Sequence, residues 1–201
     1  MPTIVKEGWT YITQATSDDY DLISEAFNTC TPIESTDDLY NLYYHLMSGY
    51  SFIAMTNYPY PTNFLMPMPG YPVNVAAAYF SGMSPDPQTS SDDRKKLVLS
   101  TIYESTSVYY NYEADPDFCT DLSDAEGTGN LEAAGWNLLA CNELTMPMSN
   151  GPNSLFLEDE FNFDAYSLYC KLEYGLTVQY YWALDFFGGW NQQLDFYHLT
   201  N

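Results

Sequence analysis

Basic residues are scarce in this 201-residue chain: 5 Lys and Arg stand against 27 Asp and Glu, which gives a formal net charge of −22 at pH 7. Nucleic acids and anionic lipids are bound through Lys and Arg side chains that neutralise phosphates, so this charge excludes both as partners. Repulsion among carboxylates eases when some of them are protonated. The charge balance therefore favours an acidic compartment or a cationic partner.

Long apolar runs are also missing. No stretch approaches the roughly 20 apolar residues that a membrane span requires, and residues 1–9, MPTIVKEGW, lack the apolar core of a signal peptide. We therefore expect no membrane partner. The four cysteines are widely spaced and include no C-x-x-C pair, so they indicate either two disulfides or buried thiols. Disulfides imply an oxidising compartment, which would place the export signal upstream of Met1.

The usual catalytic motifs are absent as well. No G-x-S-x-G turn occurs, and the nearest approach, residues 82–86 (GMSPD), is typical of an ordinary loop. The two histidines exclude H-E-x-x-H zinc chemistry; His45 lies in a helical pattern and favours a packing role, and His198 has no nearby Ser or Cys. The acidic run at residues 158–160 indicates a solvated face. These residues predict no catalytic group and no cofactor.

A calcium site is disfavoured for the acidic stretch that begins at Asp115. An EF-hand loop needs glycine at its sixth position, where this stretch has Thr120. The stretch, with Gly127 and Gly129, is instead typical of a polar loop and of a boundary between two parts of the chain. We expect no metal site.

The chain nevertheless has the composition of a folded protein, because 46% of its residues are hydrophobic and 17% are aromatic. Its length suits one large domain or two small ones. Helix signals are found at residues 16–28, after Ser35 and after Ser91, where Ser and Asp precede apolar residues at helical spacing. The prolines of residues 57–72 exclude both helix and central strand. Residues 177–182 and 194–199 are rich in β-branched and aromatic residues and predict strands.

Three segments carry a resemblance to a known family. They are residues 57–69 (NYPYPTNFLMPMP), residues 135–148 (GWNLLACNELTMPM), and residues 174–189, which place Tyr-Gly-Leu, Trp182 and Phe-Gly-Gly in order. The chain resembles the lysosomal Pro-X carboxypeptidase and dipeptidyl peptidase II family of serine peptidases. Weaker similarity links the three segments, so the resemblance spans nearly the whole chain.

The resemblance implies a mixed α and β fold. Residues 1–112 look like most of a helical cap domain that is inserted into an α/β-hydrolase domain and is incomplete at its N-terminus, and residues 113–201 look like a partial hydrolase domain. In the family the nucleophilic serine precedes the insertion, while the aspartate and histidine come after the final strand expected here. Thr200 and Asn201 match the start of the motif that contains the aspartate, so this sequence stops a few residues short of it. All three triad members therefore fall outside this sequence, and His198 receives no catalytic role.

The resemblance also assigns roles to individual residues. Cys30 and Cys119 match one family disulfide, and Cys141 and Cys170 match another. Met146 matches a position that lines the compact apolar pocket for proline, where a flexible thioether can adapt to the ring. For Trp136 we prefer packing in a core. Residues 57–69 are expected to shape the junction between the cap and the hydrolase.

The expected function is that of a fragment of a serine exopeptidase that cleaves beside proline or a small residue, either a carboxypeptidase or a dipeptidyl peptidase, lysosomal or extracellular. Its partner is a peptide substrate in the full-length parent, for which a homodimer is a further expectation. Alone, the chain is predicted to be inactive. The alternatives are a non-catalytic acidic peptide-binding protein and a non-functional remnant, which would expose unpaired strands and aggregate.

Overall fold

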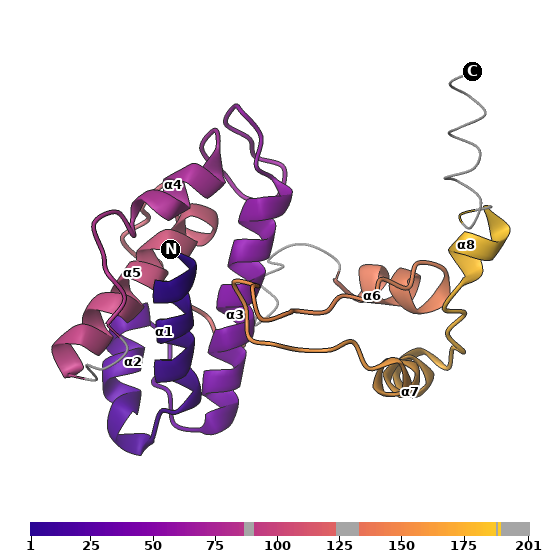
Figure 1. The fold of residues 1–201 in the computed structure, drawn as a ribbon, viewed down its shortest axis with the longest axis horizontal. Helices are drawn as coiled ribbons and strands as arrows, with labels where there is room; N and C mark the ends of the chain where they lie inside the picture. The colour runs from indigo at the N-terminus through magenta and orange to yellow at the C-terminus, as the bar shows by residue number, and fades with distance from the viewer. Residues whose placement is uncertain (87–90, 124–132, 188, 190–201) are drawn as a thin grey trace. The chain divides into compact units, whose positions relative to one another are not determined.

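The computed structural model describes residues 1–86, 91–123, 133–187 and 189. The chain divides into two compact units (Figure 1). The first unit consists of Met1–Gly129 together with Asn153–Leu157, and the second consists of Asn130–Pro152 together with Glu158–Asn201. Each unit is described by itself.

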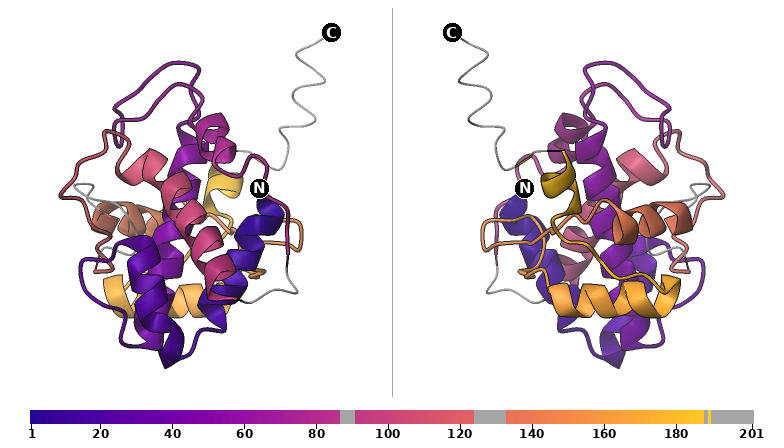
Figure 2. Two further views of the ribbon diagram at one scale, coloured as in Figure 1. Left: turned by 90° about the vertical axis from the view of Figure 1, so that its left-hand side faces the viewer. Right: turned by 90° about the vertical axis from the view of Figure 1, so that its right-hand side faces the viewer.

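The first unit is a helical bundle built around α5 (Asp92–Tyr110), which is the last helix of this unit along the chain. This helix contacts four others, α1, α2, α3 and α4. Figure 2 gives two further views of the ribbon, in the colours of Figure 1. The elements in chain order are α1 (Pro2–Thr13), the short 3-10 helix η1 (Ser17–Asp19), α2 (Tyr20–Phe27), α3 (Thr36–Met55), α4 (Pro72–Ala78) and α5 (Asp92–Tyr110).

The starts of α3 and α5 confirm the helix signals in the sequence. Ser35 and Asp38 form a reciprocal capping box: the Asp38 amide donates to Ser35 Oγ at 3.2 Å, and the Ser35 amide donates to the Asp38 carboxylate at 2.9 Å. These hydrogen bonds hold the pKa of the Asp38 carboxyl below its usual value. Ser91 caps α5 by accepting from the Arg94 amide at 3.3 Å. The helix expected at residues 16–28 is also found, as η1 followed by α2.

The core of the first unit is formed by apolar side chains that these helices turn inward. The largest fully buried side chains are Trp9, Tyr109, Phe27, Ile4, Ile12, Ile23, Leu42, Leu46, Ile53, Leu99, Ile102 and Val5. Fully burying one such side chain stabilises the fold by about 1.5–3 kcal/mol. Four of these residues lie on α1, which was not predicted from the sequence.

A segment from the second half of the chain completes this unit. The Trp9 indole N–H donates to the carbonyl of Leu155 at 2.8 Å, and the amide of Leu157 donates to the Tyr43 hydroxyl at 3.1 Å. Leu155 and Phe156 also pack against the buried core. The five residues Asn153–Leu157 therefore belong to the helical unit although they lie far from it in sequence.

Gly49 provides a stability test of the packing of α3 on α5. A Cβ atom at Gly49 would lie 2.7 Å from a ring carbon of Tyr110. That ring is stacked on His45 at 3.9 Å, and its hydroxyl donates to the His45 carbonyl at 2.7 Å, so it cannot withdraw without losing both contacts. We expect Gly49→Ala to lower the free energy of unfolding by about 1–3 kcal/mol.

The matched control for this prediction is Gly135→Ala in α6 (Ala133–Asn142), where an added Cβ meets nothing within 4 Å. Because alanine is the better helix former, this variant should be neutral or more stable by up to about 1 kcal/mol. Urea denaturation of both variants measures the difference. Equal midpoints for Gly49→Ala and the unsubstituted protein would contradict the packing described above.

The second unit contains α6, α7 (Phe163–Tyr174) and α8 (Trp182–Phe186). The disulfide between Cys141 and Cys170, with a Cα–Cα distance of 5.6 Å, joins α6 to α7. Both cysteines are buried, together with Val178, and Tyr166, Tyr174 and Leu176 pack around them. The other disulfide, between Cys30 and Cys119, has a Cα–Cα distance of 5.0 Å and lies in the first unit. Both pairings inferred from the resemblance are thus confirmed.

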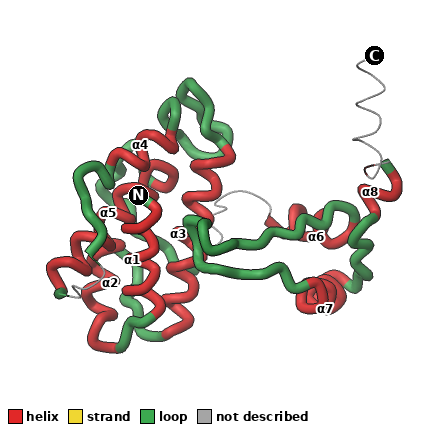
Figure 3. The backbone as a smooth tube through the Cα atoms, viewed as in Figure 1, coloured by secondary structure: helices red, strands yellow, loops and turns green. Residues whose placement is uncertain are grey.

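The prediction of a strand at residues 177–182 is wrong. In the part of the chain that Figure 3 draws in colour, helices are the only regular secondary structure and no segment is drawn as a strand. Three isolated β-bridges occur in the described residues, and none of them lies at residues 177–182. A run of β-branched and aromatic residues becomes a strand when a neighbouring strand pairs with it. Here the aromatic rings pack on one another instead: Tyr180 lies edge-on to Phe163 at 5.2 Å, and Trp182 stacks on Phe186 at 5.1 Å inside α8. The strand expected at residues 194–199 lies outside the described residues. The helical part of the expected fold is therefore found, and an α/β-hydrolase sheet is not seen in the described ranges.

Candidate functional site

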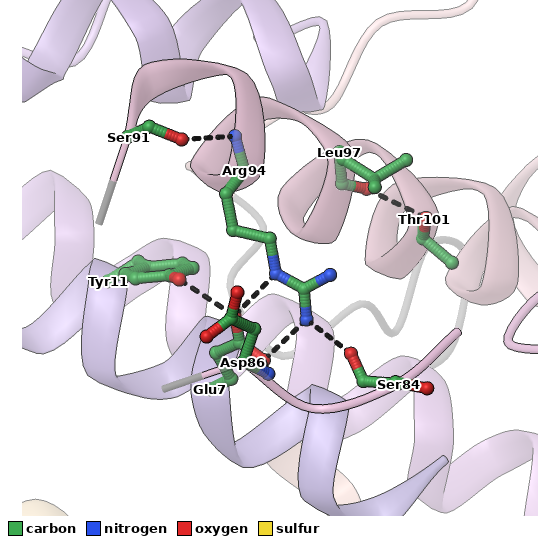
Figure 4. A network of polar contacts seen from close by, with 8 residues as sticks. All are labelled: Glu7, Tyr11, Ser84, Asp86, Ser91, Arg94, Leu97 and Thr101. Carbon is green, nitrogen blue, oxygen red and sulfur yellow. Dashed lines mark hydrogen bonds and ion pairs between the residues drawn. The ribbon is translucent and has the colours of Figure 1, made fainter. Parts of the chain in front are cut away.

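The loop that comes nearest to a serine-nucleophile turn is held by a buried ion pair (Figure 4). Arg94 donates from Nε and Nη2 to the two carboxylate oxygens of Glu7 at 2.7 and 2.8 Å, and from Nη2 also to the Ser84 carbonyl at 2.9 Å. The amide of Asp86 donates to Glu7 at 3.3 Å, and the Tyr11 hydroxyl does so at 2.7 Å. These contacts attach residues 82–86 to both α1 and α5, so this loop has a structural role.

The charges of this network stabilise one another. Hydrogen bonding from Arg94 holds the pKa of the Glu7 carboxyl below its ordinary value, although burial acts in the opposite direction. Burial and the hydrogen bond to Glu7 raise the pKa of Tyr11 to about 12. Only 3% of the Glu7 side chain and 14% of the Arg94 side chain are exposed, so the pair is shielded from solvent.

The two residues after Arg94 form further ion pairs with other elements. Lys95 binds Asp19 of η1, which lowers the pKa of that carboxyl, and Lys96 binds Glu25 of α2. Three of the chain's five basic residues thus connect one turn of α5 to three separate elements. These three basic side chains hold the helices of the first unit together.

The histidine of the described chain is a packed side chain. His45 is 5% exposed and is stacked on Tyr110. His198 lies outside the described residues. Residues 158–160 are exposed; the amide of Asp159 donates to the carbonyl of Asn150 at 3.0 Å, and the amide of Asn150 donates to the carbonyl of Asp159 at 2.7 Å. In the described ranges, no three His, Cys, Asp or Glu side chains come together in a way that could hold a metal ion. No helix in them is long and apolar enough to span a membrane.

Met146, the residue predicted to line the substrate pocket, follows α6 in a segment without helix or strand, and 37% of it is exposed. Met148, two residues further on, is 75% exposed. Trp136 lies on α6 with 53% of its area exposed. The core packing that we expected for it is therefore not found in the described part of the chain. The disulfide at Cys141 fixes the end of the helix that leads to Met146.

Trp182, a residue of the third motif, lines an open hollow of about 320 Å³ in the second unit. The hollow was not predicted from the sequence, because it forms only when the turn before α8 brings several aromatic rings together. Its lining consists of Gln179, Tyr180, Tyr181, Trp182, Asp185 and Phe186.

The first motif, residues 57–69, forms a braced loop between α3 and α4. Thr62 and Met68 exchange two backbone hydrogen bonds at 3.1 and 2.9 Å, and the amide of Tyr71 donates to the Tyr58 carbonyl at 2.7 Å. Met68 is buried, and its sulfur accepts from Thr56 Oγ1 at 3.6 Å. A side chain at Gly70 would lie 3.2 Å from the backbone of Pro59 and Tyr60, so the two limbs of the loop are closely packed. The irregular structure expected for this proline-rich segment is confirmed.

The class of protein follows from these motifs and from the family comparison. Residues 3–183 match the family described as serine carboxypeptidase S28. The chain therefore belongs to the serine carboxypeptidase S28 family, a family of serine peptidases. This match confirms the resemblance inferred from the three motifs.

Individual relatives sharpen this assignment. Over 170 residues the chain is 32% identical to lysosomal Pro-X carboxypeptidase from Bos taurus and 30% identical to that from Homo sapiens; each alignment covers 84% of this chain and 32% of the relative. Over 176 residues it is 27% identical to the prolyl carboxy peptidase like protein 5 of Caenorhabditis elegans, which covers 83% of this chain and 33% of that protein. The chain spans about a third of the length of the curated relatives it matches.

Proposed function

We propose that this chain is part of a serine exopeptidase that hydrolyses peptide bonds next to proline or another small residue. The observation that carries the proposal is the match of residues 3–183 to the S28 family, with Pro-X carboxypeptidases among the relatives. In this proposal residues 1–112 are a helical cap and residues 113–201 a piece of the hydrolase domain. The Ser, Asp and His of the triad come from outside these residues, so the chain alone is inactive.

The two disulfides support a location in an oxidising compartment, or in one that the protein reaches by passing through an oxidising compartment. The names of the bovine and human relatives point to the lysosome, and the net charge of −22 suits an acidic compartment because protonation relieves repulsion there. We therefore place the protein in the lysosome or outside the cell.

Met146 contributes to the pocket for the proline ring in this proposal. It lies just beyond the disulfide-fixed end of α6, and its partial exposure leaves the thioether accessible to a ligand. A flexible, polarisable side chain can follow the shape of a compact ring. The residue after it, Pro147, restricts the backbone of this segment.

The test is a chimera in which this chain replaces the matching segment of bovine lysosomal Pro-X carboxypeptidase, assayed with an N-blocked Pro-Phe dipeptide. We expect hydrolysis by the chimera and none by the isolated chain. Met146→Ala should lower kcat/KM of the chimera by about 10-fold or more, because apolar pocket contacts discriminate on this scale. Met148→Ala, at a more exposed methionine, is the control and should leave kcat/KM unchanged.

Other outcomes distinguish the alternatives. An inactive chimera, together with an isolated chain that binds the dipeptide without cleaving it, would favour the acidic peptide-binding protein. An isolated chain that aggregates and melts without cooperativity would favour the remnant. Equal effects of Met146→Ala and Met148→Ala on kcat/KM would contradict the assignment of Met146 to the pocket.

A further inference from the structure

One asparagine of this chain is followed directly by glycine. Every other asparagine that has a successor precedes a residue with a side chain, whereas Asn150 precedes Gly151. Asparagine deamidates without an enzyme when the backbone nitrogen of the next residue attacks its side-chain carbonyl carbon. A glycine at that place lacks the Cβ that otherwise hinders the approach. Asn150 is therefore the asparagine of this sequence that is most open to this reaction.

The fold does not require glycine at position 151. An added Cβ would meet nothing within 4 Å, and among the described glycines the two with positive φ are Gly82 and Gly175. Gly151 is exposed, as is Pro152 after it. Alanine would fit here, so neither packing nor backbone conformation explains the glycine. Its effect is to leave the Asn150 side chain open to attack from the main chain and to hydrolysis by water.

Asn150 lies at the closed end of a loop, residues 150–159. Its amide donates to the Asp159 carbonyl, and the Asp159 amide donates to the Asn150 carbonyl, so one antiparallel bridge joins the two ends. We call this bridge the neck. The one further hydrogen bond printed beside it in the described residues runs from the Phe161 amide to Ser149 Oγ at 3.0 Å. A single bridge opens more easily than a ladder of several.

The middle of the same loop belongs to the helical unit. There the Leu155 carbonyl accepts from the Trp9 indole, and the Leu157 amide donates to the Tyr43 hydroxyl. The neck fixes the length of chain on both sides of these contacts. A change in the backbone at Asn150 therefore alters the segment that covers Trp9.

We propose that Asn150 is a site of spontaneous deamidation, and that the reaction opens the neck of this loop. The Gly151 nitrogen forms a bond to Cγ of Asn150, the Cγ–Nδ2 bond breaks, and ammonia leaves with the proton of the Gly151 amide. Water then opens the five-membered imide at one of its two carbonyl carbons and leaves either aspartate or isoaspartate. The net change is one water consumed, one ammonia released and one carboxylic acid gained.

Both products weaken the neck. Aspartate places a second carboxylate directly opposite Asp159, and like charges in such opposite positions are destabilising. The exposed acids Glu158 and Glu160 on either side increase the local negative charge. Isoaspartate instead routes the main chain through the former side-chain carbon, which lengthens the backbone by one atom and shifts the two hydrogen bonds out of register. Because the ammonia is lost, the original neck does not form again.

The rate experiment is incubation of the 201-residue chain at pH 7 and about 37 °C, with peptide mass spectrometry at intervals. We expect Asn150 to deamidate about 10-fold or more faster than the exposed Asn153, because the residue after Asn153 has a side chain. Isoaspartyl methyltransferase should label the product. Gly151→Ala should slow the reaction about 10-fold or more without lowering the melting temperature, because the added Cβ fits.

The structural consequence is measured by amide hydrogen exchange. Asn150→Asp reproduces one of the products, and its peptide over residues 149–161 should exchange about 10-fold faster than that of the unsubstituted chain, because the neck no longer closes. Asn153→Asp adds the same charge within the loop and away from the neck, so it is the matched control and should leave this exchange unchanged. Peptides from α5 should exchange equally in all three proteins.

Each result decides one part of the inference. Equal rates at Asn150 and Asn153, or equal rates with and without Gly151→Ala, would overturn the deamidation site and mean that the neck keeps the nitrogen away from the side chain. Rapid deamidation with unchanged exchange in Asn150→Asp would overturn the opening of the neck. The same peptides are followed in the chimera, so the test does not depend on the stability of the isolated chain. None of these measurements requires peptide hydrolysis, so the proposed function stands or fails separately.

Discussion

Replacing Cys30 and Cys119 with serine should lower the free energy of unfolding of the helical unit by about 4–5 kcal/mol. The disulfide joins residues 89 apart in sequence, so it removes a large loop-closure entropy from the unfolded chain. Neither cysteine is buried, so loss of packing adds little to the effect. Denaturant unfolding of the double variant and of the unsubstituted protein, both without reductant, gives the difference.

Hydrogen bonds around this disulfide decide how the result is interpreted. Thr120 donates to the carbonyls of Asn28 and Phe27 at 2.8 and 2.7 Å, and the Cys30 amide donates to the Thr120 carbonyl at 2.9 Å. A loss below about 1 kcal/mol would mean that the unfolded chain already retains these contacts in part, so that the disulfide removes little loop-closure entropy. Replacing Cys141 and Cys170, which lie 29 apart and belong to the second unit, should leave the unfolding of the helical unit unchanged.

Arg94→Met should be nearly as destabilising, by about 3–5 kcal/mol, because it leaves the Glu7 carboxylate buried without its cation. The matched control is Lys96→Met, which breaks the ion pair to Glu25. Those side chains are 51% and 69% exposed, and such pairs contribute about 0–1 kcal/mol. Equal effects of the two substitutions would show that Glu7 is solvated when Arg94 is removed. Urea unfolding at pH 7 provides the comparison.

The same pair sets a dependence on pH. Because the pKa of Glu7 is lower in the folded protein than in the unfolded chain, its contribution to stability is complete above the unfolded value of about 4.3. The contribution is lost as the pH falls through the folded pKa. Glu7→Gln should therefore flatten the acid side of the stability curve, while at mildly acidic pH the unsubstituted ion pair remains intact. An unchanged acid limb in Glu7→Gln would contradict this assignment.

Local signals in the sequence were sufficient for part of the fold. Ser35 and Ser91 allowed the starts of α3 and α5 to be predicted, because a capping side chain acts within one helical turn. Helix α1 was missed, since its start at Pro2 has no side-chain cap, and α6 and α7 were missed as well. The strand expected at residues 177–182 failed because strand formation depends on a partner that local composition does not specify.

The candidate site required information of a different kind. The disulfide pairing and the role proposed for Met146 came from family motifs, because four cysteines alone allow three pairings. The ion pairs of Arg94, Lys95 and Lys96 join residues more than 70 positions apart, which no local pattern indicates. The loop of residues 57–69 combines both kinds of information: its composition is visible in the sequence, and the exposure of Tyr60 and Phe64 only in the structure.

The hydrogen bond from Trp9 to Leu155 also has a consequence for synthesis on the ribosome. The two residues are 146 positions apart, so at about 5–20 residues per second the acceptor is made roughly 7–30 s after the donor. During that interval the buried side chains of α1 and α3 can assemble, but the bundle lacks the segment that covers the Trp9 indole. Until Leu155 has been made, the nascent helical unit therefore leaves the apolar surface around Trp9 uncovered, and a chaperone can bind it there.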